Sequence, residues 1–235
     1  MKTTIKNSEI ISLINPKSPT TEAYRSLLTN IEYSSVDHQI KTIAVTSSAP
    51  SEGKSTTVAN LAVTYVDTGK RVLLVDCDLR KPRLNKLFNV SNLAGLTSVL
   101  TGKASLSESI KLIKEGMYLL PSGPIPPNPV ELIRSKAMDH FLEVVKNEFD
   151  LVILDTPPVG LVTDAALISA KLDGVILVVA SGKSQTEAVL RAKESLMNVN
   201  ANLLGAVMTM VPNTNGYQYY AYAEEEPTKK KRFGK

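Results

Sequence analysis

The chain has 235 residues, of which 43% are apolar, and this suits one globular domain with a sizeable core. The net charge is only +4, part of it from the final KKKRFGK run, and 5% of residues are aromatic, so the composition does not indicate nucleic-acid binding. The polar start argues against a signal peptide, no apolar window reaches the ~18 residues of a membrane span, and a single cysteine excludes an internal disulfide framework and fits a reducing compartment.

Runs rich in Val, Ile and Leu recur along the chain and predict strands buried on both faces, because they are nearly continuous rather than alternating. They occupy residues 42–48, 71–78, 117–123, 150–158, 173–181 and 203–211. Helical patterns lie between most of them, at residues 53–68, 129–148, 163–171 and 184–199. The helix at 129–148 has a well-marked start, with Asn128 as N-cap, Pro129 at the first position and Glu131 three residues after the cap. Glu131 fits a capping box, but a plain helix entry is the favoured interpretation. The alternation predicts an α/β fold, a parallel β-sheet flanked by helices on both faces.

The chain divides into three predicted segments. Residues 1–20 form an N-terminal arm, and residues 21–211 form the core domain. Residues 212–235 show no sustained apolar period and contain several tyrosines, which predicts a flexible tail.

The stretch SAPSEGKSTT, residues 48–57, follows the first predicted strand without a spacer. Its Gly-Lys-Ser ends a phosphate-loop pattern, although Ser48 stands where the full pattern has glycine. Backbone N–H groups and the next helix N-terminus attract phosphate, a lysine neutralises β and γ oxygens, and a serine hydroxyl can bind Mg²⁺. An ordinary strand-to-helix turn with an exposed lysine is the competing interpretation. The predicted ATP-binding residues are Ser51, Glu52, Gly53, Lys54, Ser55 and Thr56.

Three acidic residues stand at predicted strand ends. Asp76 and Asp78 share one face by the two-residue period, with Cys77 on the other face as a small buried thiol. Asp155 closes a second buried strand. Ligands of parallel sheets bind beyond the carboxyl ends of strands, so these acids could hold Mg²⁺ and polarise a nucleophile. The competing interpretation, for any one of these acids, is a carboxylate that is exposed to solvent and binds no ligand.

The ordered set of motifs resembles the bacterial tyrosine kinases of capsular and exopolysaccharide synthesis, a cytoplasmic branch of the P-loop MinD/ParA-like superfamily. SAPSEGKSTT resembles Walker A, LLVDCDLRKP the second Walker motif and LVILDTPPV Walker B. LPSGPIPPNPVELI resembles the proline-rich segment of the family, TEAYRSLLTNIEYSS its interface helix and NGYQYYAYAEEE its tyrosine cluster. The resemblance covers about residues 16 to 223 and implies that residues 21–211 are a P-loop kinase domain with an N-terminal interface helix.

The resemblance implies an ATP-dependent protein-tyrosine kinase that uses Mg²⁺. Lys54 and Asp76 would be catalytic, with Asp76 as the base for the incoming hydroxyl, and the metal would be held by Ser55, Asp78 and Asp155. The tail would be autophosphorylated in trans, on Tyr217, Tyr219, Tyr220 and Tyr222. Thr209 stands where relatives commonly have asparagine near the nucleotide base, so the adenine contacts stay open.

The resemblance also implies partners. A ring-shaped homo-oligomer would form through Glu22 and Arg25, the first two positions of a Glu-x-x-Arg-x-x-Arg pattern in which Leu28 replaces the second arginine. A separate membrane chain-length regulator would activate the kinase at the inner face of the cell membrane, and a protein-tyrosine phosphatase would reverse it. No nucleic-acid partner is expected. The kinase would regulate polysaccharide synthesis and export.

A MinD-like ATPase switch that binds partners without phosphorylating them is the alternative. Such relatives usually carry a lysine early in Walker A, where this chain has Ala49. The tyrosine cluster favours the kinase, because a kinase needs acceptor hydroxyls on a flexible tether and a switch does not. Solubilising low-complexity sequence, or packing on a partner, would also account for such a cluster.

Overall fold

The computed structural model describes residues 9–34 and 39–212. Within these ranges seven strands form one sheet in the order β3-β4-β2-β5-β1-β6-β7. Every neighbouring pair is parallel except β3 and β4 at one edge, which confirms the predicted α/β class. The strands are β1 (Thr42–Ser47), β2 (Val72–Asp76), β3 (Lys111–Lys114), β4 (Met117–Leu120), β5 (Leu151–Asp155), β6 (Gly174–Ala180) and β7 (Leu203–Thr209).

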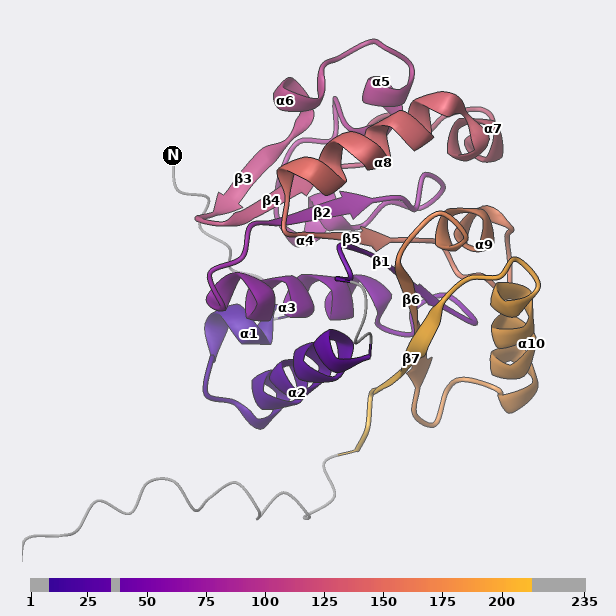
Figure 1. Ribbon diagram of the computed structural model, residues 1–235. Coiled ribbons are helices and arrows are strands. Elements are labelled where there is room, and N and C mark those ends of the chain that lie inside the picture. Colours follow the sequence, from indigo (N-terminus) through magenta and orange to yellow (C-terminus); the bar gives the residue numbers. More distant parts are fainter. Residues whose placement is uncertain (1–8, 35–38, 213–235) are drawn as a thin grey trace, which may run out of the picture.

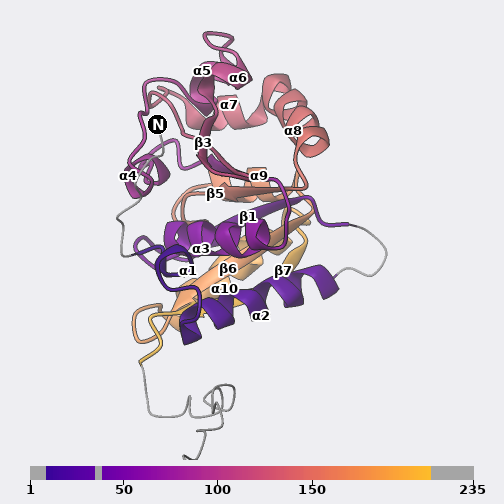
Figure 2. The same ribbon diagram turned by 90° about the vertical axis from the view of Figure 1, so that its left-hand side faces the viewer.

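Helices cover both faces of the sheet (Figures 1 and 2). One face shares a core with α1 (Ile11–Ile14), α2 (Pro19–Tyr33), α3 (Lys54–Asp67) and α4 (Leu84–Leu87). The other face shares a core with α5 (Leu96–Leu100), α6 (Leu106–Ser109), α7 (Pro129–Arg134), α8 (Lys136–Glu148), α9 (Asp164–Ser169) and α10 (Thr186–Met197).

The central strands explain why their apolar runs are continuous. In β1, Ile43 and Val45 pack toward α3, whereas Ala44 between them packs toward the opposite helices. Side chains on both faces of these strands are buried. Each large apolar side chain therefore stabilises the fold by about 1.5–3 kcal/mol through its burial. The same burial fixes the register that brings the strand ends to one edge of the sheet.

The predicted helix at 129–148 is two helices, because the chain turns at Ser135. The Ser135 hydroxyl donates to the Leu132 carbonyl (2.7 Å) and accepts from the Met138 N–H (3.2 Å), so it ends α7 and begins α8. Asn128 is the N-cap and Pro129 takes the first helical position, as expected. The Asn128 side chain makes no cap hydrogen bond, so the helix has the plain entry that the sequence favoured. Five short elements were not predicted: α1, β3, α4, α5 and α6.

The described part of the predicted arm, residues 9–20, packs on the domain. Ile10 is fully buried against the core that contains α3. The Asn60 side chain binds the backbone of this segment in both directions, accepting from Ser12 N–H (2.9 Å) and donating to the Glu9 carbonyl (2.9 Å). This part of the chain is therefore held across the first turns of α3.

No helix within 9–34 and 39–212 is long and apolar enough to cross a membrane. The four predicted acceptor tyrosines, Tyr217, Tyr219, Tyr220 and Tyr222, lie outside the described residues, and so does nearly all of the predicted tail.

Candidate functional site

The phosphate loop joins the end of β1 to the start of α3. Two residues of this loop have positive φ, Ser51 at 58° and Gly53 at 98°. A Cβ added at Gly53 would lie 3.2 Å from Thr209 Cγ2, so conformation and space both favour glycine there. Lys54 and Ser55 begin α3, with Gly53 as its N-cap, and Lys54 is only 8% exposed. A loop of this kind that leads into a helix N-terminus offers backbone N–H groups to an anion.

Glu52 is the anchor of this loop. Its buried carboxylate accepts from the Ser48 hydroxyl (2.9 Å), the Ala49 N–H (2.9 Å) and the Ser184 hydroxyl (2.5 Å). Burial alone would raise the pKa of Glu52, but these donors outweigh it and the pKa lies below its usual value. The side chain of this predicted ATP-binding residue is therefore committed to the loop. Ser48 supplies one of the anchoring hydroxyls in place of the glycine of the usual pattern.

Two later segments of the chain also hold the loop. Lys183, after β6, donates from Nζ to the Ser51 carbonyl (2.7 Å). Thr209, at the end of β7, donates from its hydroxyl to the Glu52 carbonyl (2.6 Å). Thr209 therefore has a structural contact of its own at the position where relatives commonly carry asparagine.

The sheet brings two of the three predicted acids side by side. Asp76 and Asp155 are paired in register on neighbouring strands, and both are at most 1% exposed. One Asp76 oxygen accepts from the N–H groups of Arg83 (3.0 Å) and Leu84 (2.9 Å), so this carboxylate also anchors the loop after β2. β2 ends at Asp76, which places Asp78 beyond the strand, and Asp78 is partly exposed. Cys77 is a free, buried thiol, as expected.

Burial perturbs both carboxyl groups. It raises the pKa of Asp76 well above its usual value, and the neighbouring Asp155 raises it further. Burial raises the pKa of Asp155 to about 6, although the Ser55 hydroxyl and the Lys54 ammonium oppose the shift. Asp155 Oδ1 is buried and has no hydrogen-bond partner in the part of the chain that the structure describes. A cation at this oxygen would compensate both the burial and the mutual repulsion.

These residues fit Mg²⁺ bound together with a nucleotide. Within the described ranges, no three His, Cys, Asp or Glu side chains gather closely enough to hold a metal by themselves. Mg²⁺ seldom needs such a cage, because it commonly takes one or two carboxylates together with phosphate oxygens and water. The unpaired oxygen of Asp155 and the nearby Ser55 hydroxyl match this incomplete donor set.

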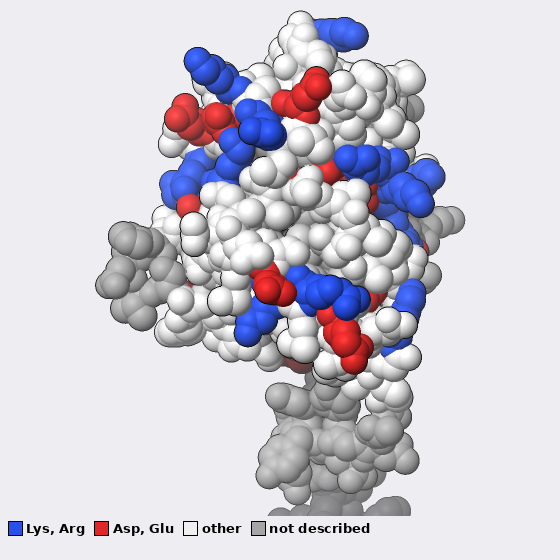
Figure 3. Space-filling view, turned by 90° about the vertical axis from the view of Figure 1, so that its right-hand side faces the viewer, with Lys and Arg blue, Asp and Glu red and all other residues white. Residues whose placement is uncertain are grey.

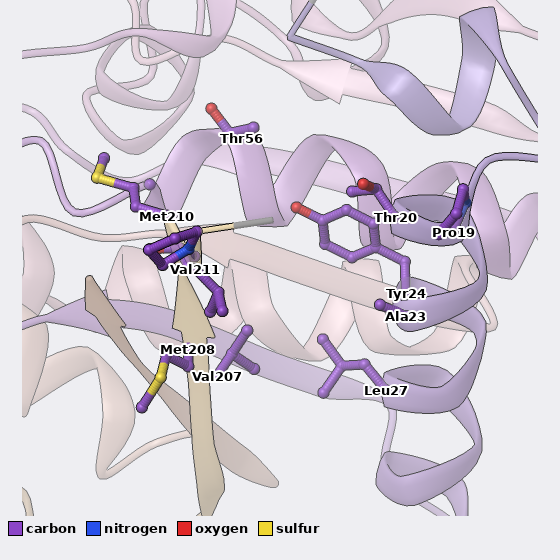
Figure 4. A pocket seen from close by; sticks show the side chains of 13 residues that line it. Pro19, Thr20, Ala23, Tyr24, Leu27, Thr56, Val207, Met208, Met210 and Val211 are labelled. Atoms are coloured by element: carbon purple, nitrogen blue, oxygen red, sulfur yellow. The ribbon is translucent and has the colours of Figure 1, made fainter. Parts of the chain in front are cut away.

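Two cavities adjoin the phosphate loop, and Gly53 and Thr56 line both. The first, of about 660 Å³, lies between α2 and the end of β7. Figure 4 shows Tyr24 and Leu27 of α2 reaching toward Val207 and Val211 across this largely apolar space. The second, of about 780 Å³, lies over Lys54, Ser55 and Asp78 and is bordered by the segments at 78–86 and 157–162.

The structure places the predicted interface residues apart from this site. Glu22 and Arg25 lie on α2, where they form an ion pair with each other and remain about two-fifths exposed. Leu28 is only 7% exposed and packs into the core with α3. The position that carries the second arginine of the family pattern therefore faces inward in this chain.

Several basic residues of the site were missed from the sequence. Arg80, Lys81, Arg83 and Lys86 all line the larger cavity. Their signal was visible as four cations within the nine residues DLRKPRLNK, directly after Asp78. Glu9 was also missed; its carboxylate accepts from the Thr56 hydroxyl (3.1 Å) and pairs with Arg83 (2.9 Å). No local pattern announces that contact, because 47 positions separate Glu9 from Thr56.

Comparison with known proteins gives consistent matches. A family model described as an AAA domain matches residues 40–204. Tyrosine-protein kinase YwqD of Bacillus subtilis (strain 168) is 45% identical over 214 residues, which cover 90% of each chain. Tyrosine-protein kinase wzc of Salmonella typhimurium is 31% identical over 229 residues, which are 95% of this chain but only 32% of that relative.

Solved structures agree with these relatives. The chimerical protein CapA2B2 has a TM-score of 0.84 at 41% identity, covering 88% of this chain and 92% of that one. The kinase domain of Escherichia coli tyrosine kinase ETK has a TM-score of 0.82 at 30% identity, covering 91% and 86%. The septum site-determining protein MinD of Pyrococcus horikoshii, complexed with Mg-ADP, has a TM-score of 0.61 at 26% identity, covering 72% and 69%. The chain therefore belongs to the family of bacterial tyrosine-protein kinases and is a protein-tyrosine kinase built on a MinD-like P-loop α/β fold.

Proposed function

We propose that this chain transfers the γ-phosphoryl group of Mg-ATP to its own C-terminal tyrosines in trans, and thereby regulates capsule or exopolysaccharide synthesis and export. The observation that carries the proposal is the pair of cavities beside one phosphate loop. Such a loop holds phosphates at its centre, so one cavity is available for the nucleotide base and the other for an acceptor. The acceptors would be Tyr217, Tyr219, Tyr220 and Tyr222.

ATP would bind with its phosphates on the backbone from Ser51 to Thr56 and its adenine in the apolar cavity next to Tyr24. Mg²⁺ would be held by Ser55, Asp155 and Asp78, where it would neutralise charge on the phosphates. The fit of the unpaired Asp155 oxygen supports this arrangement, and the MinD complex contains Mg-ADP in a related fold.

Lys54 would neutralise the charge that develops on the transferred group. Asp76 stays our candidate for the base that takes the proton of the tyrosine hydroxyl. Burial and the neighbouring Asp155 raise the pKa of its carboxyl group, which makes the carboxylate a stronger base. Its carboxylate is fully buried and holds the N–H groups of Arg83 and Leu84. Base catalysis by Asp76 therefore requires the segment after β2, which carries Arg83 and Leu84, to move away from the carboxylate when substrates bind.

Assembly would bring the tail of one chain to the site of another. Glu22 and Arg25 lie partly exposed on α2 and are available to a neighbouring subunit, which is compatible with a homo-oligomeric ring. The Salmonella relative carries the matching region within a much longer chain. We propose that a separate membrane chain-length regulator supplies the corresponding activation here and holds the kinase at the inner face of the membrane. A protein-tyrosine phosphatase would reverse the modification.

The test mixes full-length Lys54→Met protein with active protein that lacks residues 212–235, in the presence of Mg-ATP. We expect phosphotyrosine on the inactive chain, since only transfer between molecules can label it. The control is Lys54→Met protein whose four tail tyrosines are phenylalanine, which should remain unlabelled. No phosphotyrosine on the Lys54→Met chain, while intact active protein in a separate reaction labels itself at a rate independent of concentration, would contradict transfer in trans. ATP hydrolysis without any phosphotyrosine would favour the MinD-like switch.

A further inference from the structure

We infer that the larger cavity is an acceptor site that selects tyrosines followed by acidic residues, and that Lys81 and Lys86 determine this specificity. The inference deepens the proposed function and rests on it. The occupant to which we commit is the segment YQYYAYAEEE, residues 217–226, of a second copy of this chain.

The basic border of the cavity is the first argument. The segment from Asp78 to Lys86 contributes four cationic side chains to the lining, beside the single carboxylate of Asp78. Figure 3 shows the side of the molecule that lies on the right in Figure 1. Basic side chains gather along the right-hand edge of this view and also at its upper left, with acidic side chains among them. A surface of this charge recognises an anionic ligand better than a neutral one.

The four cations are not equally available. Asp164, which is fully buried, binds Arg80 through two hydrogen bonds of 2.8 and 3.0 Å. Arg83 pairs with Glu9 at 2.9 Å. Lys81 and Lys86 are exposed and form no ion pair with any residue that the structure describes. Their charges are therefore the ones left for an incoming peptide.

Apolar side chains complete the acceptor site. Ile125 is 64% exposed and Leu161 is 63% exposed, and both line this cavity. Large aliphatic side chains so exposed beside charged ones are suited to cover an aromatic ring, which brings much apolar area to a contact. The cavity thus offers apolar surface to a tyrosine ring, and its lysines offer positive charge to acidic residues next to that tyrosine.

The tail has the complementary pattern. Tyr222 is followed by Ala223 and then by three consecutive glutamates, so its first acidic neighbour stands two positions further on. In an extended chain that separation is about 7 Å, within the range of a long lysine side chain. We therefore expect Tyr222 to be the first residue modified.

Phosphorylation would then create the next acceptor. The bond between Tyr222 Oη and the γ-phosphorus forms as the bond from that phosphorus to the ADP oxygen breaks, and the hydroxyl proton passes to a carboxylate of the site. The phosphotyrosine carries about −1.5 to −2 charges and stands two positions after Tyr220. Modification should therefore begin at Tyr222, and Tyr220 should follow it.

The test uses the full-length kinase and a synthetic peptide of residues 217–226 in which Tyr222 is the only tyrosine and the other three are phenylalanine. A matched peptide replaces its three glutamates by glutamine. We expect a KM about tenfold lower for the acidic peptide with little change in kcat, as two or three exposed charge pairs would give. In Lys81→Gln/Lys86→Gln protein the KM for the acidic peptide should rise to that of the neutral peptide. Lys103→Gln/Lys193→Gln protein carries the same charge change outside the cavity and should keep the preference.

The outcomes separate this inference from the function on which it rests. Transfer to both peptides with equal KM would overturn the acceptor site and leave the kinase intact. A raised KM for ATP in Lys81→Gln/Lys86→Gln protein, with the acidic preference kept, would assign these lysines to the nucleotide. No transfer to either peptide by protein that labels its own tail would overturn the acceptor site. Protein that labels neither the peptides nor its tail would refute the kinase proposal and this inference with it. As a second measurement, mass spectrometry can follow which tail tyrosines of the full chain are phosphorylated over time. A random order of modification would contradict the selection of tyrosines that are followed by acidic residues.

Discussion

Replacing Asp155 by asparagine should stabilise the nucleotide-free protein at neutral pH, even though it impairs metal binding. Asp155 is 1% exposed, and one of its oxygens has no partner within the described residues. Burial raises its pKa from 3.8 to about 6. Because the folded pKa lies above the unfolded one, the stability that the protonated group contributes is fully present below about pH 4. It is lost as the pH rises through about 6.

The magnitude follows from the shift. A difference of about two pKa units corresponds to about 3 kcal/mol of unfolding free energy. Asparagine does not titrate, so the stability of Asp155→Asn relative to the native protein should rise by about 3 kcal/mol between pH 4 and pH 8. The two carboxyl groups interact and titrate together, so the change in stability reports on Asp76 as well as on Asp155.

The assay is chemical denaturation at several pH values without nucleotide or metal. Glu143→Gln, an exposed change of the same kind on α8, is the control and should show no such trend. Added Mg-ATP should reverse the order, because the native carboxylate gains a cation and the amide does not. A stability difference that is the same at every pH would refute the reasoning, since it would mean that burial does not penalise the Asp155 charge.

Three further predictions concern the phosphate loop and its metal. Lys54→Met should lower the rate of phosphoryl transfer at least ~100-fold while leaving the melting temperature nearly unchanged, because methionine can fill much of the space of this largely buried stem; near-native activity would show that the loop is misassigned. Asp78→Asn should raise the Mg²⁺ concentration needed for half-maximal activity several-fold, and an unchanged Mg²⁺ titration would exclude Asp78 from the metal site. Glu52→Gln should cost on the order of 2 kcal/mol of stability and weaken ATP binding, since an amide cannot accept from all the donors that surround the carboxylate; denaturant and nucleotide titrations measure the two effects.

The apolar pattern predicted the sheet well because both faces of its central strands are buried. β1 and β5 are buried at every position, so each appears in the sequence as a continuous, mostly apolar run. β3 escaped prediction because it is a short edge strand in which Ile113 is the only buried residue. The single predicted helix at 129–148 failed for a local reason: Ser135 satisfies the end of one helix and the start of the next, and apolar periodicity does not register such a break.

The candidate site was predictable only where backbone motifs define it. Gly53, Lys54 and Ser55 follow from the loop pattern, and the register of β2 and β5 brings Asp76 beside Asp155. Glu52 was predicted among the ATP-binding residues, and that stays a prediction. The anchoring role of its side chain was not predicted, because its partner Ser184 lies 132 positions away. Long-range partners of this kind leave no local signal in the sequence.

The contacts that close the phosphate loop have a consequence for the order in which this protein becomes active. Lys183, Ser184 and Thr209 reach Ser51 and Glu52 from 132 to 157 positions further along the chain. A nascent chain that has not yet released β7 from the ribosome lacks the last of these contacts, so its loop is incomplete however well β1 and α3 have formed. The tyrosine-rich tail begins only a few residues after Thr209. Nucleotide binding by this loop would therefore become possible only late in synthesis, shortly before the tail emerges.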